Sequence, residues 1–167
     1  MRKILAGFGS FLFFFIAPGI VAGLAPWWIS QGRLQPPFLG QPGMRAAGIV
    51  LLVLGLVPLV ESFARFVWKG LGTPAPIFPT RYLVVSGLYR YLRNPMYVAV
   101  VTIVLGEALL TGSKQLLFYA ILIWLGFFLF VRLYEEPALR RRFGAEYQNF
   151  CRHVPRWIPR LTPWRGA

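Results

Sequence analysis

Two adjacent glutamates, Glu135 and Glu136, follow the last long apolar stretch of the sequence and are the first candidates for chemistry. Neighbouring carboxylates repel each other, and the edge of a membrane or the C-terminus of a helix disfavours negative charge. Such an unfavourable placement suggests a purpose, such as holding a cation or a set of hydroxyl groups. The alternative is that the pair begins a new helix, where glutamate is favourable and Pro137 suits the first turn.

A second candidate is the segment SGLYRYLRNPMYV, residues 86–98, which lies between two apolar stretches. Asn94 and Pro95 predict a helix start, since asparagine is a good N-cap and proline is preferred at the first helical position. A helix start also presents free N–H groups to an anionic ligand, and Gly87 lets the backbone turn or approach a ligand closely. The segment therefore suits either a basic turn at a membrane surface or one wall of a binding site.

Charged residues inside the apolar stretches are further candidates. Glu61 and Arg65 are four residues apart and are expected to share one helix face, either as a structural pair or as a contact to a substrate. Arg132 is expected on the same helix face as Glu135, where it would anchor the helix at the interface or hold a phosphate or carboxylate. Glu107 lies near the far end of its stretch and is expected to reach outward to water or to Lys114.

The rest of the residue inventory excludes several kinds of site. One cysteine and one histidine rule out an internal disulfide and a Cys/His zinc cluster. The chain has no aspartate, so a Ser-His-Asp triad is excluded. We therefore expect no metal site, and any chemistry must come from Glu, Arg, Tyr, Asn or a bound cofactor.

The elements that position these residues are expected to be membrane-spanning helices. The composition is 57% hydrophobic and 17% aromatic, more apolar surface than a soluble domain of 167 residues can bury. Apolar stretches long enough to cross the ~30 Å hydrocarbon core predict a polytopic all-α fold. A Pro- and Gly-rich segment, 25–44, is expected to be a loop with an aromatic anchor at Trp27 and Trp28. The four predicted spans are 4–24, 46–68, 95–111 and 115–134.

The segment after Glu135 has a different pattern. Leu139, Phe143, Tyr147 and Phe150 recur at helical spacing, with arginines largely on the other side, which predicts an amphipathic helix at the membrane surface. We expect a single membrane domain, 1–167, in which 1–68 holds two spans and 69–164 holds the cofactor-binding connection, a helical hairpin and this amphipathic helix.

The basic residues predict the orientation. The net charge of +13 is typical of nucleic-acid binders, but the 18 Lys and Arg gather at the ends of the apolar stretches, which favours a role in topology. Only Arg33, Arg45 and Lys114 fall on one side. The excess on the other side predicts cytoplasmic termini, contact with anionic lipid at the cytoplasmic face, placement in the cytoplasmic membrane, and no nucleic-acid partner.

Several of these motifs together resemble one enzyme family. LVVSGLYRYLRNPMYV, a hairpin, and then EEPALRRRFGAEYQNFCRHVPRWIP resemble the isoprenylcysteine carboxyl methyltransferase and phospholipid methyltransferase family over about residues 70–160. The resemblance implies an integral-membrane enzyme that moves a methyl group from S-adenosylmethionine to a lipid or lipidated substrate. It implies a cofactor pocket lined by Leu83, Gly87, Tyr89, Arg93, Asn94, Tyr97, Glu135 and Glu136.

The methyl acceptor is left open by the sequence. An amine must lose a proton, for which Glu61 or one of the glutamate pair is a candidate base. A carboxylate acceptor would instead use Arg65, Arg93 or Arg132 as its anchor. The low number of His, Cys and Asp residues is compatible with either, because the cofactor supplies the reactive group.

Two other functions compete with methyl transfer. Some sterol reductases that use NADPH share a similar hairpin and Arg-x-Pro-x-Tyr region, and the Arg140–Arg142 run is a candidate contact for a 2′-phosphate. A non-enzymatic protein that binds anionic lipid would account for the basic tail but not for the glutamate pair. Methyl transfer is the preferred interpretation because it uses both motifs.

Overall fold

The computed structural model describes residues 18–69 and 83–165 of the chain, and all regular elements in these ranges are helical. This confirms the all-α prediction for the described residues. In chain order the elements are the π-helical turn η1 (Ile20–Leu24), α2 (Ala25–Ser30), the 3₁₀ turn η2 (Phe38–Gly40), α3 (Gly43–Lys69), the 3₁₀ turn η3 (Gly87–Arg90), α4 (Pro95–Thr111), α5 (Lys114–Phe130), the π-helical turn η4 (Val131–Glu135) and α6 (Glu136–His153).

Two described helical stretches are long and apolar enough to cross a membrane. One covers Gly43–Arg65, and the other begins at Lys114 and runs on through η4 and α6, with its apolar part in α5. Only 28% and 17% of their most apolar windows are buried inside the protein, so neither is the core helix of a soluble fold. These helices match the predicted second and fourth spans. The predicted third span is also a helix, α4, but at 17 residues it is shorter than these two helical stretches.

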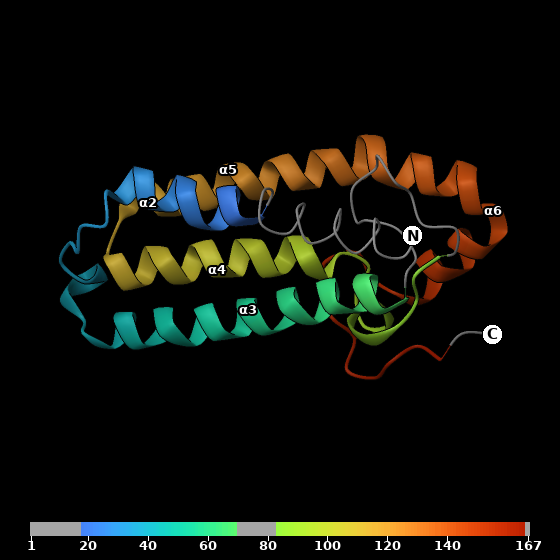
Figure 1. Ribbon diagram of the computed structural model, residues 1–167, viewed down its shortest axis with the longest axis horizontal. Helices are drawn as coiled ribbons and strands as arrows, with labels where there is room; N and C mark the ends of the chain where they lie inside the picture. The colour runs from blue at the N-terminus through green and yellow to red at the C-terminus, as the bar shows by residue number, and fades with distance from the viewer. Residues whose placement is uncertain (1–17, 70–82, 166–167) are drawn as a thin grey trace.

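Helices α3, α4 and α5 run side by side, each antiparallel to the one before it (Figure 1). The closest approach is between α3 and α4, because glycines face backbone there. A Cβ at Gly48 would lie 2.7 Å from the Gly106 carbonyl oxygen, and one at Gly55 would lie 2.8 Å from the Ala99 carbonyl oxygen. Since real Cβ atoms do not come so near, only glycine permits this spacing.

The main apolar core lies along this α3–α4 contact. Leu59 and Phe63 of α3 pack with Ala99, Val100 and Ile103 of α4, all at most 5% exposed. Close packing of this kind fixes the register of the two helices. It therefore fixes where the end of α3 lies relative to the start of α4.

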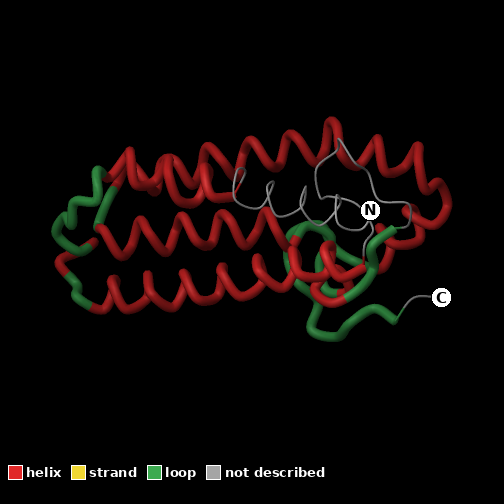
Figure 2. The backbone as a smooth tube through the Cα atoms, viewed as in Figure 1, coloured by secondary structure: helices red, strands yellow, loops and turns green. Residues whose placement is uncertain are grey.

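The loops gather at the two ends of the bundle (Figure 2). At one end the Gln35 amide donates to the Thr111 carbonyl at 2.8 Å, and Arg45 donates to the Gln35 carbonyl at 3.1 Å. The other end holds η3, the start of α4, and the tail that follows α6. The predicted cofactor-lining residues lie at this second end, whereas Glu107 lies near Thr111 toward the first end.

The predicted loop 25–44 is wrong in its first part. Residues Ala25–Ser30 form α2, with Pro26 in its first turn, where the missing N–H of proline costs nothing. The sequence pattern was misleading because proline both starts helices and interrupts them. Trp27 and Trp28 are exposed, as an interfacial anchor requires, but they lie on a helix. Of the predicted first span, residues 4–17 lie outside the described residues, and 18–24 are helical.

The helix of the fourth span continues into the tail helix, because the five-residue turn η4 connects α5 directly to α6. The interruption comes later, at Gly144, whose φ of 51° breaks α6. Glu107 does not reach Lys114 in an ion pair among the described residues; its Oε2 is buried without a hydrogen-bond partner there.

Candidate functional site

The glutamate pair lies at the junction between α5 and α6, beyond the apolar part of α5, and its two carboxylates have different partners. Tyr97 of α4 donates its hydroxyl to Glu135 Oε2 at 2.9 Å. The Tyr97 ring packs against Phe127 of α5, with ring centroids 4.7 Å apart. The first turn of α4 is thus joined to the end of α5 by aromatic contacts and to η4 by a hydrogen bond, which hold Glu135 toward α4.

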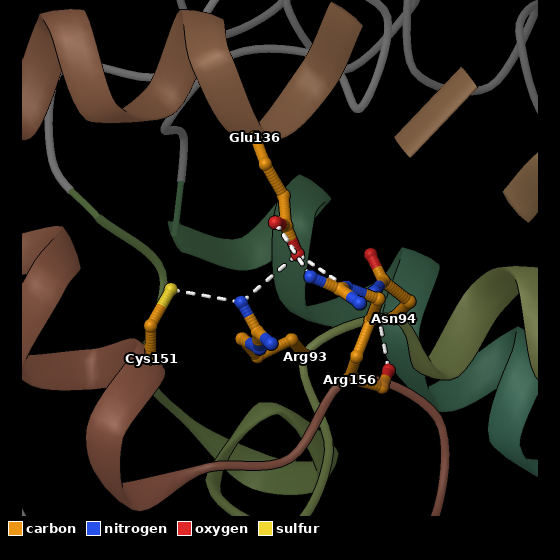
Figure 3. A network of polar contacts seen from close by, with 5 residues as sticks. All are labelled: Arg93, Asn94, Glu136, Cys151 and Arg156. Atoms are coloured by element: carbon orange, nitrogen blue, oxygen red, sulfur yellow. Dashed lines mark hydrogen bonds and ion pairs between the residues drawn. The ribbon is translucent and has the colours of Figure 1, made fainter. Parts of the chain in front are cut away.

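Glu136 is 5% exposed and receives hydrogen bonds from two arginines (Figure 3). Arg156 donates from Nε to Oε1 at 2.6 Å and from Nη2 to Oε2 at 2.9 Å, and Arg93 donates from Nη1 to Oε1 at 2.9 Å. The same Arg93 nitrogen lies 2.8 Å from Cys151 Sγ. A buried carboxylate needs this kind of compensation, since an unpaired charge there is strongly destabilising.

The environments move the pKa values of the two carboxyls apart. Burial raises the pKa of Glu135, the charge of Glu136 adds to that rise, and the Tyr97 hydrogen bond opposes it. Burial would also raise the pKa of Glu136, but the Arg156 hydrogen bonds and the charges of Arg93 and Arg156 outweigh burial and lower it. Glu136 is therefore held ionised, whereas Glu135 is the carboxyl of the pair that more readily takes a proton.

The tail after α6 is tied to the connection before α4 by backbone hydrogen bonds. The Arg93 amide donates to the Pro155 carbonyl at 2.9 Å, the Arg160 amide to the Tyr91 carbonyl at 3.0 Å, and the Trp164 amide to the Arg90 carbonyl at 3.0 Å. Beside these bonds, Tyr147, Phe150 and Val154 form a second apolar cluster that Leu83 and Val85 cover. The tail is thereby held across the end of the bundle.

Asn94 does not act as the predicted side-chain cap. It occupies the N-cap position of α4, but its side chain makes no capping hydrogen bond, and its Nδ2 donates to the Arg156 carbonyl at 3.1 Å. Pro95 at the first helical position has no N–H, which removes one of the unpaired donors at the start of α4. The amide is therefore used to hold the tail, which the local sequence does not indicate.

Gly87 brings η3 against the Glu61–Arg65 pair of α3. Arg65 Nε is bonded to Glu61 Oε1, as the spacing predicted. Gly87 has a φ of 57°, and a Cβ there would overlap the Arg65 guanidinium. The backbone conformation favours glycine, and any Cβ would have to displace the Arg65 guanidinium. The predicted cofactor wall and the predicted substrate pair are in contact at this residue.

Tyr89 of η3 lies near two carboxylates, those of Glu135 and Glu61. Burial raises the pKa of its hydroxyl, and the negative charges of Glu135 and Glu61 raise it further. The ring is therefore near one carboxylate from η4 and another from α3. A buried phenol near negative charge stays protonated and can donate a hydrogen bond.

The structure thus separates the predicted site residues into three sets. Glu61, Arg65, Gly87, Tyr89, Tyr97 and Glu135 form the cluster around Tyr89. Arg93, Asn94 and Glu136 hold the tail, and Leu83 packs on the second apolar cluster. Arg132 is exposed on η4.

Sequence reasoning missed Arg156 and Cys151. Arg156 is one of several arginines in the tail, and no local pattern distinguishes it. Its partners Glu136 and Asn94 lie 20 and 62 residues away in sequence. Cys151 lies on α6 near Arg93, where spacing along α6 could not have placed it. Among the described residues, His, Cys, Asp and Glu side chains form no group of three that suits a metal ion.

The region that contains the cluster around Tyr89 is similar to a known protein family. The family model for phospholipid methyltransferases matches residues 44–146. Phosphatidylethanolamine N-methyltransferase of Arthroderma otae is 37% identical over 120 residues, which are 68% of this chain and 12% of that protein. The protein of the same name from Botryotinia fuckeliana is 28% identical over 139 residues, 75% of this chain and 14% of that protein. No solved structure matches the chain significantly.

The chain spans only a small part of these relatives. It corresponds to between 8% and 14% of the length of the similar curated proteins, including that of Paracoccidioides brasiliensis at 37% identity over 80 residues. The matched region nevertheless contains Glu61, Gly87, Tyr97 and Glu135. Arg156 lies beyond the matched region, as do Cys151 and α2.

Proposed function

The chain belongs to the phospholipid methyltransferase family, and we propose that it transfers methyl groups from S-adenosylmethionine to the amine of a membrane phospholipid. The observation that carries the proposal is that the family match encloses all the residues of the cluster around Tyr89. The names of the relatives, phosphatidylethanolamine N-methyltransferases, favour an amine acceptor over the carboxylate that the sequence alone left open.

The residues present fit this cofactor. When bound, S-adenosylmethionine supplies a methyl group on a sulfonium cation, together with hydroxyl groups and an amine. Glu135 is a hydrogen-bond acceptor for hydroxyls or the amine, and the rings of Tyr89 and Tyr97 suit a nearby cation. Gly87 brings the backbone of η3 directly against Arg65, which keeps Arg65 and Glu61 next to this proposed site.

Within the proposed cofactor set, the residues have two different tasks. Glu135, Tyr97, Tyr89 and Gly87 make direct contact with the cofactor. Glu136, Arg93 and Asn94 hold the tail, and Leu83 packs beneath it, so that this end of the bundle is covered. A covered site excludes water and holds the reactants in line, an effect worth up to ~7–11 kcal/mol.

The membrane arrangement belongs to the same proposal. Residues 1–167 form one membrane domain with four spans, and both termini and the cluster around Tyr89 face the cytoplasm. The exposed arginines of α6, Arg140, Arg141 and Arg142, point to anionic lipid as the surface on which α6 lies. Arg132, exposed at the start of the same segment, is better suited to this surface than to a reacting group.

Two measurements test the proposed function. Calorimetry with S-adenosylhomocysteine should show binding to the purified protein, and the binding should be lost in Glu135→Ala. Mass spectrometry of membrane lipids should show added methyl groups when the protein is expressed. Folded protein that binds no S-adenosylhomocysteine would contradict the proposal, and a change in nicotinamide fluorescence on mixing would favour a reductase instead.

A further inference from the structure

The Glu61–Arg65 pair has unused capacity for hydrogen bonding. Glu61 Oε1 is bonded to Arg65 Nε, but Glu61 Oε2 is buried and has no hydrogen-bond partner among the described residues. The hydroxyl of Ser86, next to Gly87, is also buried and has no hydrogen-bond partner among the described residues. Buried polar atoms are almost always satisfied, so such atoms at one place indicate a missing ligand.

A groove along α3 leads to this pair. Its volume is about 550 Å³, which is within the ~300–1,000 Å³ range of small-molecule sites. The described residues that line it are Leu56, Val57, Val60 and Ala64, with Glu61 and Arg65 as its charged members. An apolar groove with one charged position suits a molecule with a long apolar part and a charged end.

Arg65 and Glu61 together match a zwitterion. Arg65 uses Nε for Glu61, and its guanidinium carries further N–H donors on the two Nη groups. A guanidinium binds phosphate well, and a carboxylate oxygen binds an ammonium. Because the two side chains are in contact, the phosphate and the ammonium they bind must be close together, as they are in an ethanolamine phospholipid.

We propose that Glu61 and Arg65 form the headgroup site for an amine phospholipid, in which Arg65 binds the phosphate and Glu61 Oε2 binds the ammonium and takes its proton. This inference rests on the proposed function for the reaction, but not for the binding of the lipid. The acyl chain lies in the α3 groove. Contact through Gly87 and Tyr89 then places the amine on the same side of the bundle as Glu135.

The proton that the lipid ammonium must lose is taken up by Glu61. An alkylammonium, with a pKa near ~10.4 as in lysine, is protonated at neutral pH and has no lone pair for attack. Transfer of one N–H proton to Glu61 Oε2 gives a neutral amine and a neutral carboxylic acid. Among the described residues, Arg65 on α3 is bonded to Glu61, and Tyr89 on η3 lies near both Glu61 and Glu135, which Tyr97 bonds.

The first test measures rate against pH with phosphatidylethanolamine in Glu61→Gln. The amide still accepts from Arg65 but cannot take a proton, so kcat should fall by ~10²–10⁴-fold at neutral pH. The remaining rate should rise about tenfold per pH unit, because only the free amine reacts. Glu61→Asp, which keeps a carboxylate, should recover part of the rate. Glu107→Gln on α4 is the matched control and should leave kcat unchanged.

The second test needs no cofactor. Native mass spectrometry of the protein with bound lipid should show preferential retention of phosphatidylethanolamine over phosphatidylglycerol. Glu61→Gln should remove this preference, because it removes the partner of the ammonium. Arg65→Gln should weaken retention of both lipids, because both carry a phosphate.

Binding of S-adenosylhomocysteine separates the two proposals. Wild-type affinity in Glu61→Gln shows a folded protein, so a lost rate then supports the headgroup site. If the folded wild type binds no S-adenosylhomocysteine, the proposed function fails, while the lipid-retention test still decides the headgroup site. Wild-type kcat in Glu61→Gln, or an unchanged preference for phosphatidylethanolamine, would overturn the inference.

If Glu61→Gln does not fold, the pH–rate profile and the lipid preference of Glu61→Asp decide the inference. A shifted pH–rate profile or a reduced preference for phosphatidylethanolamine supports the headgroup site. Wild-type behaviour in both measurements overturns it.

Discussion

The guanidinium of Arg156 donates two hydrogen bonds to the carboxylate of Glu136, from Nε at 2.6 Å and from Nη2 at 2.9 Å. This bidentate contact joins the tail to the junction of α5 and α6. Arg93 donates to the same carboxylate from the segment before α4. One buried acid therefore connects three parts of the chain that are far apart in sequence.

We expect Arg156→Ala to destabilise the protein by about 1–3 kcal/mol, because a buried carboxylate loses its bidentate partner and retains only Arg93. Thermal unfolding in detergent measures this. Arg141→Ala is the control, since Arg141 is exposed and surface substitutions change stability little. Equal stability of the two variants would show that the contact does not hold the tail.

The lowered pKa of Glu136 predicts how stability depends on pH. A carboxyl whose pKa is lower in the folded protein stabilises it fully above the unfolded value of ~4.3, and the contribution is lost as pH falls through the folded value. Wild-type protein should therefore be more stable than Glu136→Gln at neutral pH, and the difference should shrink below about pH 4. Unfolding temperatures of both proteins between neutral and acid pH test the prediction, and a gap that persists at acid pH would contradict it.

Tyr97→Phe should weaken binding of S-adenosylhomocysteine. The substitution removes the hydroxyl that orients Glu135 and keeps the ring against Phe127. Loss of a hydrogen bond to a charged group costs about 1.5–3 kcal/mol, which is roughly a 10–100-fold change in affinity if the full effect reaches the ligand. Calorimetry gives the affinity.

The control for this variant is Tyr119→Phe. Tyr119 also uses its hydroxyl, donating to the Val21 carbonyl at 3.0 Å, but it lies on α5 outside the cluster around Tyr89. It should leave the affinity for S-adenosylhomocysteine unchanged. Equal losses in the two variants would indicate a general effect on the fold, and no loss in Tyr97→Phe would separate the Tyr97–Glu135 bond from cofactor binding.

Gly87→Ala should reduce both stability and activity. An alanine in the left-handed region costs about 1–2 kcal/mol, and its Cβ would also displace Arg65. Gly40→Ala provides the comparison, because Gly40 has a φ of 66° with no atom near the position of a Cβ. The activity loss should be confined to Gly87→Ala, as measured by methyl transfer to phosphatidylethanolamine. Similar activity in both variants would show that contact with Arg65 is unimportant.

The sequence by itself determined the helices and the residue types available for chemistry. The lengths of the apolar stretches predicted α3, α4 and α5, since a helix that contacts lipid must be apolar over its whole length. The i, i+4 spacing predicted the Glu61–Arg65 pair because it is local to one helix. The Asn94-Pro95 pair predicted the start of α4 but not the use of the asparagine amide.

Only the tertiary structure decided which of these residues meet. Glu135 and Glu136 are adjacent in sequence, yet one faces Tyr97 and the other faces Arg93 and Arg156. Their directions depend on how α5 continues through η4 and on where the tail crosses the bundle, and neither follows from local pattern. The approach of Gly87 to Arg65 likewise depends on the packing of α3 against α4, because side chains and backbone far apart in sequence set that distance together.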